Sequence, residues 1–149
     1  MVILIDSREK RFEHITSKLE QQNIAYKFKK LNFGDYSFEI DGKSYENKIC
    51  IERKGSISEV IGNFTKGRKR FENEFKRAKG CKVILTIEAS EGDIDAHRYK
   101  SSMTPSKVKS FLKTWTYYFG LQLVFVDKFN SADFILGSFK DYLTKDTAK

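Results

Sequence analysis

Two carboxylates and a lysine within residues 34–54 have the types and spacing that metal-assisted hydrolysis requires. Asp35 follows a glycine at the start of this segment, and Glu52 and Lys54 stand two residues apart at its end. Carboxylate oxygens bind hard divalent cations and leave coordination positions for water and for a phosphate oxygen. A lysine beside them could orient that water or neutralise charge that develops on the phosphate. The three residues could therefore hydrolyse a phosphodiester, although their spacing alone equally fits a solvated strand face.

Hairpin geometry predicts that these carboxylates converge. Alternation along a strand puts Cys50 and Glu52 on one face. Asp41 and Gly42 form a turn signal between two strand-like runs. A two-residue loop there would place Asp35 opposite Lys48, and a four-residue loop would place it opposite Cys50. In either register Asp35 shares the face of Glu52, with roughly 5–10 Å between their Cβ atoms.

The apolar pattern predicts the elements that must hold these side chains. Strands are expected at 2–6, 25–31, 83–88 and 121–126, a hairpin at 36–40 and 45–54, and helices at 10–22, 56–78, 104–119 and from 130 or 131 to 143, with a loop at 91–100. Strands alternating with helices, plus one hairpin, favour an α/β fold in which helices flank a central mixed β-sheet. A length of 149 residues suits a single domain over 1–149.

The charge balance favours a polyanionic partner such as DNA. The formal net charge is +8, and each Lys or Arg that meets a phosphate releases condensed counterions. Residues 66–79 carry seven basic and two acidic residues, and residues 100–113 carry four lysines and no acid. The candidate nucleic-acid contacts are Lys66, Arg68, Lys69, Arg70, Lys107 and Lys109. Arg68 and Arg70 equally suit a solvated helix face.

The cysteines and histidines give no sign of a metal site. Cys50 and Cys81 stand in or beside apolar runs and are expected to be buried thiols of a reducing compartment. His14 and His97 are isolated and are expected to be inert. Trp115 lies on the apolar stripe of its helix, which favours packing in the core or in a dimer interface.

The hydropathy pattern argues against a membrane protein. No apolar run approaches the ~18 residues that a membrane span needs. The N-terminus is apolar for four residues after Met1 and then charged, which is unlike a signal peptide. We expect a cytoplasmic protein that does not associate with a membrane.

Three ordered motifs resemble those of a known family. The segment IDSRE at 5–9, the pair GD at 34–35 and the triplet ERK at 52–54 match the XPF-type structure-specific nuclease family, a branch of the restriction-enzyme-like superfamily. Residues 57–75 resemble the helix that follows ERK in that family. The tail from residue 97 onward is similar to phage and prophage members that consist of the nuclease domain alone, which implies a bacterial or phage-infected host cell.

The resemblance implies a restriction-endonuclease-like fold and Mg2+- or Mn2+-dependent cleavage of branched or flapped DNA, usually by a dimer, in recombination, repair or replication. Asp35 and Glu52 match the family's metal carboxylates, and Lys54 matches its catalytic lysine. Arg53 and Arg8 match basic residues that support the site or contact the phosphate.

Two positions match the family's pattern less closely. Asp6 enters the site through the IDSRE motif, whereas the residues alone equally fit a strand-end salt bridge with Arg8. The family also places an acid four residues after the lysine of ERK, where this chain has Ser58 and then Glu59. One helical residue rotates a side chain by ~100°, so Glu59 can replace that acid only if the helix start shifts.

Two other functions compete with a DNA nuclease. The first is a catalytically inactive DNA-binding subunit, because XPF-type nucleases include inactive partners. Such partners are expected to lose GD or ERK, and both motifs are intact here. The second is a ribonuclease acting on structured RNA, because the same metal chemistry serves both backbones.

Apolar residues in the C-terminal half favour a homodimer. Two helices that cover one small sheet should leave some of their large side chains at the surface, and such patches usually mark interfaces. The residues concerned are Val108, Phe111, Leu112, Trp115, Tyr118, Phe119, Ile135, Leu136, Phe139, Tyr142 and Leu143. The alternative is that all of them are core.

Overall fold

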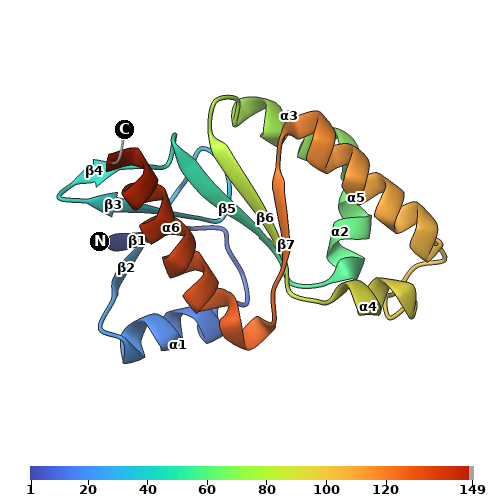
Figure 1. Cartoon of the computed structure of the whole chain (residues 1–149), viewed down its shortest axis with the longest axis horizontal. Helices are drawn as coiled ribbons and strands as arrows, with labels where there is room; N and C mark the ends of the chain where they lie inside the picture. The colour runs from blue at the N-terminus through green and yellow to red at the C-terminus, as the bar shows by residue number, and fades with distance from the viewer. Residues whose placement is uncertain (148–149) are drawn as a thin grey trace.

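A computed structural model describes residues 1–147 (Figure 1). The strands are β1 (Val2–Asp6), β2 (Ala25–Lys29), β3 (Tyr36–Ile40), β4 (Lys43–Ser44), β5 (Ile49–Lys54), β6 (Lys82–Ile87) and β7 (Gln122–Phe125). The helices are α1 (Glu13–Gln21), α2 (Ile57–Phe64), α3 (Arg68–Arg77), α4 (Glu91–Asp95), α5 (Pro105–Phe119), the short 3-10 helix η1 (Lys128–Asn130) and α6 (Ser131–Thr147).

The strands form one mixed sheet within the described part of the chain. Its order is β2-β1-β3-β5-β6-β7, and β4 pairs with β3 beside this path. β3 runs antiparallel to both β1 and β5, whereas β5, β6 and β7 are mutually parallel. This architecture confirms the predicted α/β fold with a central mixed sheet, a hairpin and flanking helices.

The helices cover the sheet on both faces, and each face has its own core. One core joins α2, α3 and α5 to Cys50, Val83 and Leu85 of the sheet. The other joins α1 and α6 to the alternate residues, among them Ile49 and Ile51. In Figure 1, α1 and α6 lie on one side of the sheet, and α2 and α5 lie on the other side. Because neighbours in a strand point to opposite faces, Glu52 and Lys54 share the face of Cys50.

The hairpin differs in register from both expectations. Asp41 and Gly42 do form a two-residue turn with positive φ values of 50° and 79°, but β4 pairs with β3 over two residues only. The chain then makes a second turn at 45–48, closed by hydrogen bonds from the backbone N–H groups of residues 48 and 49 to the carbonyl of Tyr45. These four extra residues shift the return strand, so Tyr36 pairs with Ile51.

Two predicted elements are wrong. The single helix expected at 56–78 is two helices, α2 and α3, separated by a turn at 65–67. Gly62 and Gly67 bracket this turn, and the backbone N–H of Gly67 donates to the carbonyl of Gly62 at 3.0 Å; glycine is a poor helix former. The loop expected at 91–100 begins with α4, which starts at a capping box between Ser90 and Asp93.

The other elements lie close to their predicted positions. Thr104 caps α5, Pro105 is its first residue, and Gly120 ends it in the left-handed conformation at φ 64°. Trp115 is buried in the core, as one of the two sequence alternatives had it. None of the helices in residues 1–147 is long and apolar enough to span a membrane.

Candidate active site

Asp35 and Glu52 lie on neighbouring segments of the sheet and line one cavity. Asp35 directly precedes β3, whose Tyr36 pairs with Ile51 of β5. Two hydrogen bonds hold Asp35 against β5, because Asp35 N–H donates to the Ile51 carbonyl at 2.9 Å and Arg53 N–H donates to Asp35 Oδ2 at 2.8 Å. The two carboxylates therefore converge, as the sequence predicted, although the hairpin register is neither of the two expected.

Gly34 permits this close approach. Its φ is +77°, a region that favours glycine, and a Cβ at this position would lie 3.0 Å from Cys50 Cβ and 3.1 Å from Cys50 Sγ. A side chain here would push the strand that carries Asp35 away from β5. In the GD motif, Gly34 therefore lets the chain approach β5 closely, and Asp35 is the residue that this approach brings to the cavity.

Lys54 holds Glu52 from the same face of β5. Its Nζ lies 3.2 Å from Glu52 Oε1 and 4.8 Å from the centre of the Phe71 ring. Both side chains are 9% exposed. Burial lowers the pKa of Lys54, but the charges of Glu52 and Asp35 outweigh this effect and the net shift is upward. Lys54 therefore remains an ammonium group at neutral pH.

The two carboxylates are destabilised as anions. Burial raises the pKa of Glu52 to about 7, with Lys54 opposing this rise and Glu74 adding to it. Asp35 is partly exposed, yet burial of its carboxylate and the charge of Glu52 raise its pKa well above the usual value. Two desolvated carboxylates at one point are a favourable arrangement for a cation.

The donor set fits a hard divalent cation. In the hydrogen bonds described above, Asp35 uses Oδ2 and Glu52 uses Oε1, so each has a second oxygen to offer. A cavity of about 150 Å³ opens over them, with room for water ligands. No group of three or more Asp, Glu, His or Cys residues in the described chain has metal-binding geometry. A cation here would therefore have two protein carboxylates and depend on water or substrate oxygens for the rest.

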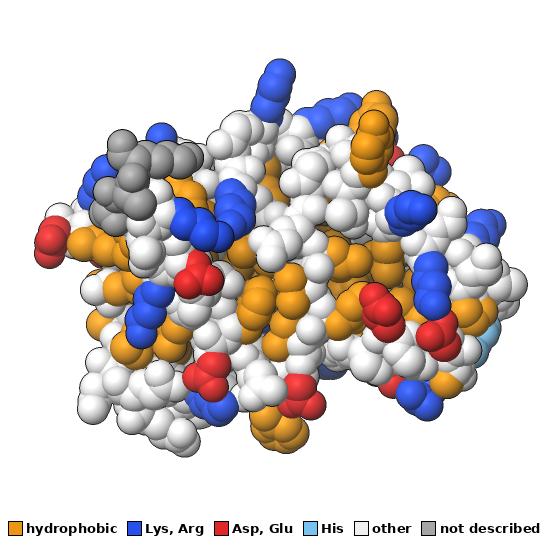
Figure 2. Space-filling view, in the orientation of Figure 1, with side chains coloured by type: hydrophobic (Ala, Val, Ile, Leu, Met, Phe, Trp, Pro, Cys, Tyr) orange, Lys and Arg blue, Asp and Glu red, His pale blue; other side chains and the backbone are white. Residues whose placement is uncertain are grey.

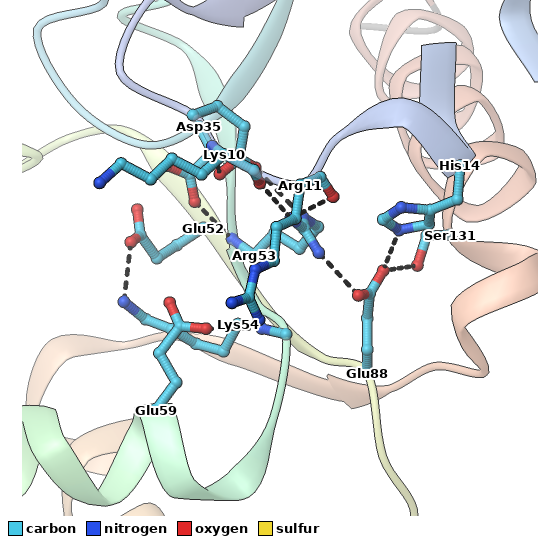
Figure 3. A network of polar contacts seen from close by, with 12 residues as sticks. Lys10, Arg11, His14, Asp35, Glu52, Arg53, Lys54, Glu59, Glu88 and Ser131 are labelled. Carbon is cyan, nitrogen blue, oxygen red and sulfur yellow. Dashed lines mark hydrogen bonds and ion pairs between the residues drawn. The ribbon is translucent and has the colours of Figure 1, made fainter. Parts of the chain in front are cut away.

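Arg53 points away from this cavity. Its buried guanidinium group binds Glu9, Glu88 and the backbone at residues 10 and 11, and we call this set of contacts the clamp. Its side chain is 5% exposed. Its Nε lies 3.1 Å from Glu9 Oε2, its Nη1 lies 2.6 Å from Glu88 Oε1, and its Nη2 donates to the carbonyls of Lys10 and Arg11 (Figure 3). Of the two roles that the resemblance allowed, the geometry favours support of the site over contact with a phosphate.

His14 extends the clamp, so the expectation that it is isolated is wrong. Its Nε2 lies 2.6 Å from Glu88 Oε2, which also accepts a hydrogen bond from Ser131 Oγ at 2.5 Å (Figure 3). Glu88 therefore ties the end of β6 to β5, α1 and the start of α6. No sequence signal joins these residues, which stand 74 and 43 positions from Glu88.

Asp6 and Arg8 form the strand-end salt bridge. Asp6 Oδ2 accepts from Arg8 Nε at 3.0 Å, and Oδ1 accepts from Arg8 Nη2 at 3.2 Å and from the backbone N–H of Leu31 at 2.9 Å. Both oxygens of Asp6 are thus engaged, and its side chain is 5% exposed against 60% for Arg8. Asp6 serves to position Arg8 at the edge of the cavity.

Neither candidate for the family's last acid reaches this cavity. Ser58 Oγ accepts from the backbone N–H of Lys100 at 2.9 Å. Glu59 Oε2 accepts from the backbone N–H of Gly55 at 2.9 Å, and Glu59 N–H donates to Ser56 Oγ. Glu59 instead lines a neighbouring cavity beside Arg53.

Helix α3 supplies residues that sequence reasoning missed. The cavity is lined by Asp6, Arg8, Asn32, Phe33, Gly34, Asp35, Glu52, Arg70, Glu74 and Arg77. Glu74 and Arg77 are not among the site residues predicted from the sequence, although their spacing from Arg70 places all three on one helix face.

The remaining basic candidates lie elsewhere on the surface. Arg68 pairs with Glu72 at 3.0 Å and lines a groove against α5. Lys109 forms an ion pair with Asp95. Lys66, Lys69 and Lys107 are exposed.

The cysteines are both free thiols. Cys50 is buried, as expected, whereas Cys81 is only partly buried. Their Sγ atoms are 3.8 Å apart. His97 stacks on Tyr99 and its Nε2 lies 2.6 Å from the carbonyl of Ser101.

The sequence and the fold both match known proteins. The family described as the ERCC4 domain matches residues 5–136. XPF from Aeropyrum pernix has a similar fold, with a TM-score of 0.70 and 21% identity over 94% of this chain and 60% of that chain. XPF from Aeropyrum pernix in complex with DNA is also similar, with a TM-score of 0.71 and 22% identity over 97% of this chain and 66% of that one. This chain thus spans 60% to 66% of the length of these relatives. No curated protein sequence matches it.

Proposed function

Because this chain belongs to the ERCC4 domain family, we propose that it is a metal-dependent DNA endonuclease that hydrolyses phosphodiester bonds in branched or flapped DNA. The observation that carries the proposal is the convergence of Asp35 and Glu52 on one open cavity, with the ammonium group of Lys54 beside Glu52. DNA recombination, repair and replication all produce such substrates.

Asp35 and Glu52 are the residues that would hold the cation, which when bound polarises a phosphate and lowers the pKa of water. Both carboxylates must be ionised to do so, and the raised pKa of Glu52, about 7, means that cation binding releases a proton near neutrality. Mg2+ and Mn2+ both suit this oxygen donor set.

Lys54 contributes charge to this reaction. Its pKa is raised in the metal-free protein by the charges of Glu52 and Asp35, so it carries a positive charge. This ammonium group can donate a hydrogen bond that orients the attacking water, and it can stabilise negative charge on the phosphate. Arg53 holds β5 against the segment at 9–11 and so keeps Glu52 and Lys54 in place.

The experiment that tests the proposal uses end-labelled DNA of several shapes. Linear duplex, flap, fork and four-way-junction DNA are incubated with the pure protein and Mg2+ or Mn2+, with EDTA as the control. We expect cation-dependent cuts near the branch in at least one junction substrate. Binding without any cleavage would instead identify an inactive DNA-binding subunit, and cleavage confined to a structured RNA would identify a ribonuclease.

We also propose a homodimer, on a narrower surface than the sequence suggested. Ile135, Leu136 and Phe139 are at most 4% exposed and belong to the core. On α5, however, Tyr117 and Tyr118 are 89% and 77% exposed. Apolar side chains also gather in the centre of the face shown in Figure 2. A cavity of about 250 Å³ is lined by residues of α4, α5 and β7, among them Leu112 and Leu123.

A further inference from the structure

Three arginines from two elements surround the cavity above Asp35 and Glu52. Arg70 and Arg77 come from α3 and Arg8 follows the end of β1. On α3 the residues Arg70, Glu74 and Arg77 are four and then three positions apart, which aligns them along one face of the helix. Phe71 and Phe75 of the same helix are buried in the core at 3% and 5% exposure, and this burial fixes the orientation of α3.

The fold does not require the two α3 arginines. The side chain of Arg70 is 86% exposed and its Nε is 4.0 Å from Glu74 Oε1, the limit for an ion pair. Arg77 is exposed, and it has no hydrogen bond or ion pair with the residues that the structure describes. Exposed pairs of this kind contribute little to stability, so both guanidinium groups are free to bind a ligand.

Arg8 differs in being held in advance. Asp6 binds its Nε and one terminal nitrogen, and that nitrogen also donates to the carbonyl of Leu31 at 3.2 Å. The other terminal nitrogen, Nη1, has no partner within residues 1–147. The hydrogen bond to Asp6 raises the pKa of Arg8 further above its ordinary value, so the group is always charged. Because Asp6 and the Leu31 carbonyl already fix this guanidinium group, it loses little conformational freedom when it binds an oxyanion.

The charge of the cavity explains why a phosphate would need these arginines. Asp35, Glu52 and Glu74 line the same space and would repel a phosphate even when one divalent cation is bound. Arginine presents a planar fork of N–H donors that matches phosphate oxygens. The three guanidinium groups that line the cavity offset the charge of these carboxylates.

We propose that Arg8, Arg70 and Arg77 bind the phosphate at which the strand is cut. This inference rests on the proposed nuclease function and adds residues to the same site. It also separates two neighbours on one helix. Arg70 contacts the reacting phosphate, whereas Arg68, which faces α5 and pairs with Glu72, does not.

The test compares Arg70→Ala and Arg77→Ala with Lys76→Ala, which removes a positive charge from the same helix on the side that faces α5. Single-turnover cleavage of flap DNA in Mg2+ should fall roughly 10- to 100-fold in the first two variants, the range for a hydrogen bond to a charged group. The Lys76→Ala variant should stay within about threefold of the unmodified protein. Arg77→Lys keeps the charge but loses the fork, and should recover only part of the rate.

A second readout needs no cleavage. Binding of a flap DNA with an uncharged methylphosphonate at the cleaved linkage is measured by fluorescence anisotropy, with Ca2+ in place of Mg2+. The neutral linkage should weaken binding by roughly tenfold in the unmodified protein and in Lys76→Ala, because a charged contact is lost. In Arg70→Ala and Arg77→Ala that penalty should shrink to about twofold or less, since each variant already lacks one of the contacts.

Cleavage by Arg70→Ala and Arg77→Ala within about threefold of the unmodified protein would overturn the proposal, and so would an undiminished methylphosphonate penalty. If the unmodified protein cuts no DNA, the proposed function fails, and the binding arm still decides this inference. A methylphosphonate is then moved along the strand. A single position at which the penalty disappears in Arg77→Ala supports the three-arginine site, and the absence of any such position refutes it.

Discussion

At the scale of single residues, Asp35 and Glu52 each offer one oxygen to the cavity, so neither can replace the other. We expect Asp35→Asn and Glu52→Gln to leave the fold intact and to reduce Mg2+-dependent cleavage by at least ~100-fold, about 2.7 kcal/mol of transition-state stabilisation. Single-turnover rates measure the loss, and circular dichroism checks the fold. Near-normal turnover in either variant would remove these residues from the metal site.

The raised pKa of Glu52 predicts how stability depends on pH. The folded protein holds a proton on Glu52 up to about pH 7, whereas the unfolded chain releases it near the ordinary value of 4.5. Between these values the folded state binds more protons, so the metal-free protein should lose stability as pH rises. Thermal melting in EDTA from pH 4.5 to 8 measures this slope.

The same melting series contains its own controls. Glu52→Gln cannot ionise, so its melting temperature should fall less steeply with pH than that of the unmodified protein. Added Mg2+ should raise the melting temperature more at pH 8 than at pH 5, because it binds the ionised carboxylates. Equal slopes for the two proteins would contradict the assignment of the raised pKa to Glu52.

The residues of the site were predictable to different degrees. The shared face of Asp35 and Glu52 follows from the two-residue period of a strand, which any hairpin register of the same parity preserves. His14, Glu88 and Ser131 meet only because α1, β6 and α6 pack together, and no local pattern contains that information.

At the scale of elements, Arg53 joins β5 to the segment after β1 and to the end of β6. Arg53→Ala would leave Glu9 and Glu88 buried without their cationic partner, at a cost of about 3–5 kcal/mol. Urea unfolding measures this loss. Arg68→Ala is the matched control, because its exposed pair with Glu72 should contribute no more than about 1 kcal/mol. A loss of similar size in both variants would mean that the clamp has no structural role.

The sequence specified the elements better than their ends and connections. The capped helix α5 and the buried strand β6 follow from strong local signals, Thr104 with Pro105 and an unbroken apolar run. The break between α2 and α3 was missed because apolar residues on both sides of Gly67 continue one helical pattern. The short helix α4 was missed because it contains only one buried apolar residue, Ile94, and so shows no helical apolar pattern.

At the scale of the whole molecule, the exposed tyrosines of α5 predict how the protein associates. If Tyr117 and Tyr118 lie in a dimer interface, analytical ultracentrifugation at micromolar concentration should give a species of twice the chain mass of 17.4 kDa. Replacing Tyr118 by glutamate should shift the protein to the monomer, because a charge at the centre of an interface is left desolvated. A clean monomer with and without DNA would rule out the dimer.

The second turn of the hairpin, at 45–48, restricts how the length of this segment can vary. It adds four residues to the return path, and an even number leaves Glu52 facing the cavity, whereas an odd number would turn it toward α6. Insertions and deletions between Ile40 and Ile49 should therefore be tolerated in steps of two. One added residue should abolish activity, and two added at the same exposed tip should be nearly silent. The length of this hairpin segment is therefore constrained in units of two residues.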